Sequence, residues 1–84
     1  MITANKAYQI VTTNHPNEYV HAMNEHESYY SFILLNKGEK IENVTFIFWV
    51  TIIDKRTGIM KKVGMDELDD DYKRIDISNF KGEP

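Results

Sequence analysis

The most concentrated chemical groups in this chain are carboxylates near its C-terminal end. Residues 66–71 carry five acidic side chains, interrupted only by Leu68. A calcium-binding loop needs alternating oxygen ligands, a glycine at the sixth position and a closing glutamate, and this spacing is absent. Two interpretations remain: a solvated connection that keeps a small protein soluble, or a surface that imitates nucleic-acid phosphates. The carboxylates concerned are Asp66, Glu67, Asp69, Asp70 and Asp71, and the basic residues Lys73 and Arg74 follow closely.

The three histidines do not form a metal-binding pattern. No two of His15, His21 and His26 are spaced to share one face of a helix, and His26-Glu27 lacks the second histidine of a zinc-protease motif. A hairpin that brought His21 opposite His26 would give a two-histidine site, but ordinary surface histidines are the favoured interpretation. Without cysteine there is no thiolate ligand either. We therefore expect no metal and no cofactor.

No pattern of nucleophilic catalysis is present. Ser28, Ser31 and Ser78 lack the flanking glycines of a nucleophile elbow, and the four glycines stand singly rather than in a phosphate-binding loop. We therefore expect a protein that is not an enzyme.

The stretch around which the chain is organised is residues 44–54. Almost every position in it is β-branched or aromatic, which predicts one long β-strand. Side chains alternate between the two faces of a strand. The even positions from 44 to 52 are wholly apolar, so we expect them to face a core covered by a helix; they are Val44, Phe46, Phe48, Val50 and Ile52. The odd positions, which we expect on the opposite, mixed face, are Thr45, Ile47, Trp49, Thr51 and Ile53.

A hairpin is predicted directly after this strand. Asp54 can accept hydrogen bonds from the backbone ahead of it, and Gly58 can adopt a positive φ where the chain reverses. A loop of about four residues then fixes the register. The expected pairs are Ile53 with Met60, Thr51 with Lys62, Val50 with Val63, Trp49 with Gly64 and Phe48 with Met65.

The remaining pattern predicts an α+β fold. Apolar residues at helical spacing indicate an N-terminal helix over about residues 3–13, capped by Thr3. Alternation indicates strands over about 19–23, 28–35, 44–54 and 59–65. We expect a single domain, 1–84, in which the helix packs on one face of a four-stranded, mainly antiparallel sheet in meander order, with the 44–54 strand central. The tail, 66–84, begins as an acidic irregular segment and is expected to add an edge strand or to lie across the mixed face.

An aromatic patch is the main functional candidate. Trp49 and Tyr29, with Ile47 and Ile33, are expected on the face away from the helix. Such residues, if exposed, are good anchors for a protein partner. The alternative is a second small core beneath the tail.

A resemblance supports the binding interpretation. The chain has a short helix reading Ala7-Tyr8-x-Ile10-Val11, followed by antiparallel strands that end in a turn reading Asp54-Lys55-x-Thr57-Gly58. Over about residues 2–63 this pattern resembles PepSY-type modules and related small α+β immunity or inhibitor proteins. The resemblance implies a non-catalytic domain that acts by binding another protein.

Composition narrows the classes of protein further. The net charge of −3 argues against direct binding of nucleic acid, and no apolar run approaches the about 20 residues of a membrane span. The lack of cysteine and of a secretory signal favours the cytoplasm. The abundance of Lys, Ile, Asn and Tyr resembles proteins from AT-rich bacterial or phage genomes, and we expect a phage or prophage origin. We expect a small cytoplasmic binding or inhibitory protein, with a homodimer as one mode of assembly and an acidic mimic of nucleic acid as the alternative.

Overall fold

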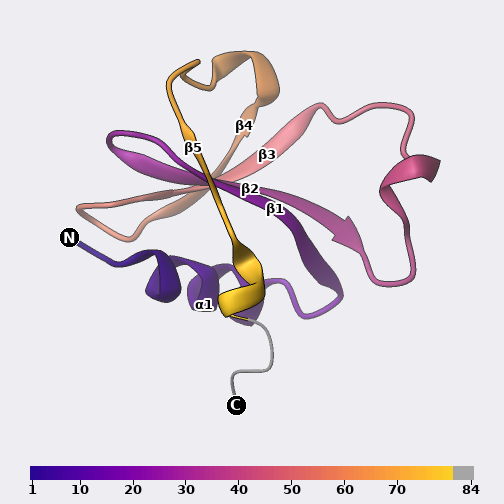
Figure 1. The fold of residues 1–84 in the computed structure, drawn as a ribbon, viewed down its shortest axis with the longest axis horizontal. Helices are drawn as coiled ribbons and strands as arrows, with labels where there is room; N and C mark the ends of the chain where they lie inside the picture. Colours follow the sequence, from indigo (N-terminus) through magenta and orange to yellow (C-terminus); the bar gives the residue numbers. More distant parts are fainter. Residues whose placement is uncertain (81–84) are drawn as a thin grey trace.

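The computed structural model describes residues 1–80 as one α-helix and a five-stranded antiparallel sheet (Figure 1). The sheet order is β4-β3-β2-β1-β5. The α+β antiparallel fold is therefore confirmed, but the sheet has a fifth strand and β2 lies at its centre. The last four residues of the predicted tail, 81–84, lie outside the described residues. The elements are α1 (Ala4–Asn14), β1 (Glu18–Glu25), β2 (Tyr29–Asn36), β3 (Trp49–Asp54), β4 (Met60–Gly64) and β5 (Lys73–Ile75).

The helix α1 begins where the sequence indicates. The Thr3 hydroxyl accepts a hydrogen bond from the Lys6 backbone N–H at 3.1 Å, which satisfies one of the unpaired donors of the first turn. Ala7 and Val11 are fully buried against the sheet. A helix of 11 residues has little stability alone, so this apolar contact holds it in place.

The β3–β4 hairpin has the predicted register. Trp49 pairs with Gly64, Val50 with Val63 and Ile53 with Met60. In the turn the Asp54 carboxylate accepts hydrogen bonds from the backbone N–H groups of two following residues, at 2.8 and 2.9 Å. These bonds lower the pKa of Asp54, the one from Thr57 most strongly. Gly58 supplies a φ of 73°, as the reversal requires.

The helix covers the other face of β3 from the one predicted. β3 pairs with β2 so that Ile53 lies opposite Tyr30, and both belong to the core cluster that includes Ala7 and Val11. The odd positions of β3 therefore face α1, and the prediction that the even positions do so is wrong. Val50 and Ile52 are nevertheless buried, with 2% and 8% of their surface exposed. Alternation could not decide between the faces, because each carries apolar side chains over residues 50–53, Val50 and Ile52 on one face and Ile53 on the other.

The chain after β4 covers the second face of the sheet. It forms a short 3₁₀ turn, Met65–Glu67, and then donates a hydrogen bond from the Asp69 backbone N–H to the Tyr29 hydroxyl at 2.9 Å. It next pairs as β5 along β1, which confirms an edge strand in the tail. Figure 1 shows this segment passing from one side of the sheet to α1 on the other. There the ring of Phe80 lies 5.2 Å from that of Tyr8.

Candidate functional site

Residues 44–48 do not belong to a strand, although the sequence predicts one. β3 begins only at Trp49. If the hairpin register continued, residues 44–48 would pair with 65–69, which are mostly acidic. One bond does continue, from the Met65 backbone N–H to the Phe48 carbonyl at 2.9 Å. The chain then turns away, held by the Glu67 carboxylate, which accepts from the Gly64 backbone N–H at 2.7 Å.

The same segment also separates from β2. The β2–β3 ladder ends at Phe32 opposite Thr51, whereas β2 continues beside β1 as far as Asn36 opposite Glu18. The two halves of the sheet therefore diverge, and the connection of residues 37–48 extends from one side of the molecule (Figure 1). No backbone hydrogen bond joins residues 45–47 to any other of residues 1–80.

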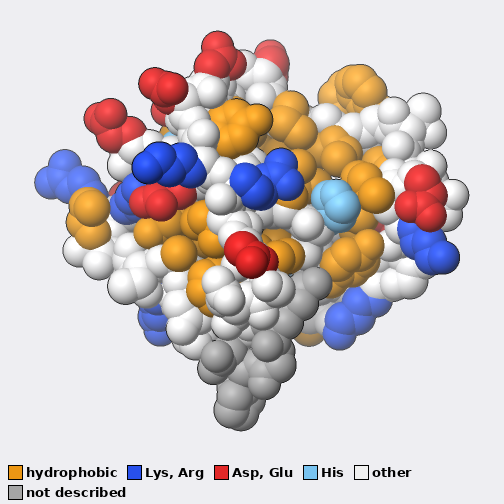
Figure 2. All heavy atoms as spheres, viewed as in Figure 1, with side chains coloured by type: hydrophobic (Ala, Val, Ile, Leu, Met, Phe, Trp, Pro, Cys, Tyr) orange, Lys and Arg blue, Asp and Glu red, His pale blue; other side chains and the backbone are white. Residues whose placement is uncertain are grey.

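Three aromatic side chains are exposed at this divergence. Phe46, Phe48 and Trp49 have 64%, 65% and 61% of their surface exposed, and we call them the aromatic surface. The rings of Phe46 and Phe48 meet edge to face, with centroids 3.9 Å apart. Figure 2 shows hydrophobic side chains at the upper right, over the connection that leads into β3. Exposed aromatic groups of this kind are uncommon on monomeric proteins and mark interaction sites.

Trp49 also borders a small hollow beyond the C-terminal end of α1. Its lining combines polar and apolar side chains, among which His15 Nδ1 lies 2.9 Å from a Glu18 carboxylate oxygen. The hollow is lined by His15, Glu18, Phe32, Leu34, Trp49, Thr51 and Lys62.

The four residues predicted as a partner-binding patch lie on different faces of the sheet. Trp49 alternates with Ile53 and faces the helix side, whereas Tyr29 lies opposite Asp54 and faces away from the helix. Ile33 shares the face of Tyr29 and is half-buried, as is Ile47. The shared face predicted for Tyr29 and Trp49 is therefore wrong, and only Trp49 of the four is well exposed. Phe46 and Phe48, which we predicted in the core, are instead exposed and belong with Trp49 to the aromatic surface.

His26 is buried, although it was expected at the surface. Its ring stacks on Tyr29 with centroids 4.3 Å apart, and Nε2 lies 2.8 Å from the Ser31 hydroxyl. Within the described residues Nδ1 has no partner. Burial lowers the pKa of His26; the charge of Asp69 opposes this shift and that of Lys55 adds to it. Although a serine–histidine pair can form a nucleophile, Ser31 is 1% exposed, so this pair is closed to substrate.

Beside His26 lies a buried lysine. Lys55 Nζ donates to a Glu25 carboxylate oxygen at 2.8 Å and lies 5.1 Å from the centre of the Tyr30 ring. Burial raises the pKa of Tyr30, and the nearby Glu25 charge raises it further. Since Lys55 is already paired and covered, its ammonium group acts in the fold rather than as a site for an anion.

The residues of the predicted acidic surface are exposed, and two of them also make hydrogen bonds that stabilise the fold. Figure 2 shows carboxylates gathered at the top of the view, over the segment that follows β4. Glu67 and Asp69 make the hydrogen bonds described above, whereas Asp70 and Asp71 line a shallow depression with Glu27. Arg74 donates to the Asn24 side chain at 2.8 Å across β1 and β5. The five predicted acidic residues, all exposed, are Asp66, Glu67, Asp69, Asp70 and Asp71.

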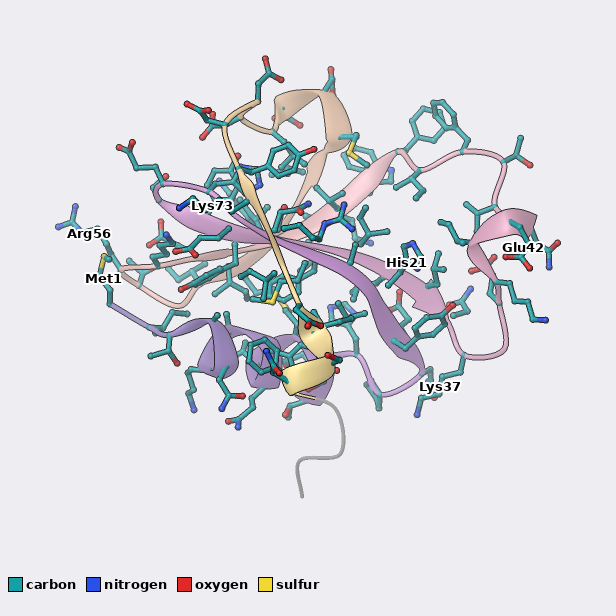
Figure 3. The ribbon with its side chains drawn as sticks, in the orientation of Figure 1. Met1, His21, Lys37, Glu42, Arg56 and Lys73 are labelled. Atoms are coloured by element: carbon teal, nitrogen blue, oxygen red, sulfur yellow. The ribbon has the colours of Figure 1, made fainter. Side chains whose placement is uncertain are left out.

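The histidines occupy three separate environments. His15 pairs with Glu18, His26 is buried, and His21 is an exposed residue at the irregularity in β1 (Figure 3). Across residues 1–80 no three His, Cys, Asp or Glu side chains are grouped to hold a metal ion. The two-histidine site considered for His21 and His26 therefore has an exposed member and a buried one.

Comparisons with protein-family models, with curated proteins and with solved structures find no match. No helix within residues 1–80 is long and apolar enough to cross a membrane.

Proposed function

We propose that this protein is a non-catalytic module that binds protein through the aromatic surface. The observation that carries the proposal is the exposure of Phe46, Phe48 and Trp49, each above 60%, at and next to residues 45–47, which have no backbone partners within residues 1–80. The proposal includes two expectations from the sequence. One is the inhibitory role implied by the resemblance to small inhibitor modules, and the other is the cytoplasmic location expected from the lack of cysteine.

The size of the surface supports a binding role. Covered Phe and Trp side chains each bury about 150–250 Å². Three that are about 60% exposed therefore leave on the order of 300–450 Å² open to a partner. Phe46 and Phe48 form one exposed patch, because their rings are in contact, and exposed apolar patches often mark interaction sites. Tryptophan is among the residues that contribute most to binding energy.

Site-specific photo-crosslinking tests the proposal and its acidic alternative together. We expect a photo-reactive phenylalanine analogue in place of Phe48 to capture a discrete protein species in cell lysate. The same analogue at Gln9, on the exposed side of α1, is the control and should capture none. Capture from position 70 alone would favour the acidic mimic instead, because Asp70 belongs to the carboxylate group.

Trp49→Ala should weaken the captured interaction. Loss of a central aromatic anchor costs about 2 kcal/mol or more, which is roughly a 30-fold rise in Kd. Titration of the identified partner by calorimetry measures the change, with Gln9→Ala as the matched control. Equal capture from positions 48 and 9, or an unchanged Kd for Trp49→Ala, would contradict the proposal.

A further inference from the structure

Part of the backbone that carries the aromatic surface has no hydrogen-bond partner within residues 1–80. Residues 45–47 have free N–H and C=O groups on both sides within the described part of the chain, yet their sequence is strongly strand-forming. Such a segment is a template for another strand. We infer that the partner is a second copy of this chain, which pairs antiparallel through residues 44–48 about a two-fold axis at Phe46. The inference rests on the proposed function, because it names the occupant of the same surface.

The charges around the segment permit this pairing. Residues 43–50 contain no charged residue, no glycine and no proline. With Phe46 opposite its own copy, Glu42 lies opposite Val50 of the second chain, so no like charges meet. The aromatic and β-branched side chains of each copy then lie beside those of the other, which is a favourable arrangement for strand pairs.

The free edge of β4, unlike residues 44–48, is protected against pairing with another strand. β4 is the outermost strand on its side of the sheet, and it carries the exposed residues Lys61 and Lys62. Charged residues, especially lysine, on an edge strand prevent association through it. The chain therefore protects the edge strand β4 from other strands, whereas residues 43–50 carry no charge, which favours pairing through residues 44–48.

The area available indicates a weak, reversible dimer. Two copies of the aromatic surface supply roughly 600–900 Å², whereas stable interfaces bury at least about 1,200 Å² in total. The paired backbone and the neighbouring Met65, which is 37% exposed, add to this area. The sum lies at the lower limit of specific interfaces, so we expect a weak dimer that dissociates on dilution.

Two measurements test the dimer. Sedimentation velocity of the wild-type protein, from about 1 to about 500 µM, should show a monomer that converts to a dimer and to nothing larger. The second measurement uses the absence of cysteine in the chain. Residues directly opposite in an antiparallel pair have Cα atoms about 4.5–5.5 Å apart, which suits a disulfide bond. Phe46→Cys should therefore form a disulfide-linked dimer under mild oxidation.

The control is Ile59→Cys, which is equally exposed, at 63%, but lies in the β3–β4 turn. We expect Phe46→Cys to crosslink at least about tenfold faster, because pairing raises the effective concentration of the two thiols. A wild-type monomer at all concentrations, or equal crosslinking rates, would overturn the inference. In that case capture of a different protein from position 48 would leave the proposed function intact, whereas absence of any capture would remove both.

Discussion

Phe32→Ala should remove about 3–5 kcal/mol of the free energy of unfolding. Phe32 is fully buried at the centre of β2, the middle strand of the sheet, and belongs to the cluster beneath α1. Its truncation removes apolar contacts and leaves a cavity that the surrounding strands can close only in part. Since a domain of this size has a total stability of roughly 5–15 kcal/mol, a large share would be lost. Urea unfolding followed by circular dichroism measures the change.

Phe46→Ala is the matched control for this experiment. The residue type and the truncation are the same, but the Phe46 ring is 64% exposed and packs mainly on Phe48. We therefore expect a change within about 0.5 kcal/mol. A loss at Phe46 similar to that at Phe32 would place residues 44–48 in the core, as the sequence predicts, and would contradict the exposed surface.

The protein should also lose stability as the pH falls below about 6.5. His26 is 2% exposed, and burial holds its pKa below the ordinary value of 6.5. In this range the unfolded chain binds a proton that the folded chain resists, so acidification favours unfolding. The contribution of His26 is complete above the unfolded pKa and declines toward the lowered folded pKa, by at most about 1.4 kcal/mol per pH unit.

His26→Phe isolates this effect from that of other groups. Phenylalanine retains an aromatic ring beside Tyr29 but cannot titrate, and it leaves the Ser31 hydroxyl without its partner. The variant should be less stable at pH 7 yet show a smaller slope of unfolding free energy between pH 5 and 6.5. Urea titrations at a series of pH values measure both slopes. Equal slopes would show that His26 is not held neutral by burial.

Local chemistry made part of the fold predictable. Thr3 determines where the helix begins, and Asp54 with Gly58 determines the turn and hence the β3–β4 register. The orientation of β3 was not predictable in the same way, because each of its faces carries apolar side chains and the two faces are covered by different segments. The choice is made by pairing with β2, at Tyr30 opposite Ile53, which involves residues far apart in the sequence.

The candidate site was predicted only at Trp49. Phe46 and Phe48 were assigned to the core because their residue types favour a buried strand. The hairpin register did carry a contrary signal, since it places the acidic residues after Gly64 opposite 44–48. That register would place Asp66 opposite Ile47 and Glu67 opposite Phe46, which are poor strand pairs, so the end of β4 there has a local cause. No feature of the sequence indicated that His26 would be buried.

The fluorescence of Trp49 reports whether the aromatic surface is exposed, because Trp49 is the only tryptophan in the chain. At sub-micromolar concentration the aromatic surface should be open, so we expect red-shifted emission that acrylamide quenches nearly as well as that of a free indole. As the concentration rises into the range of dimer formation, the emission should shift to the blue and quenching should decrease. Blue-shifted emission protected from acrylamide at the lowest concentration would contradict the account.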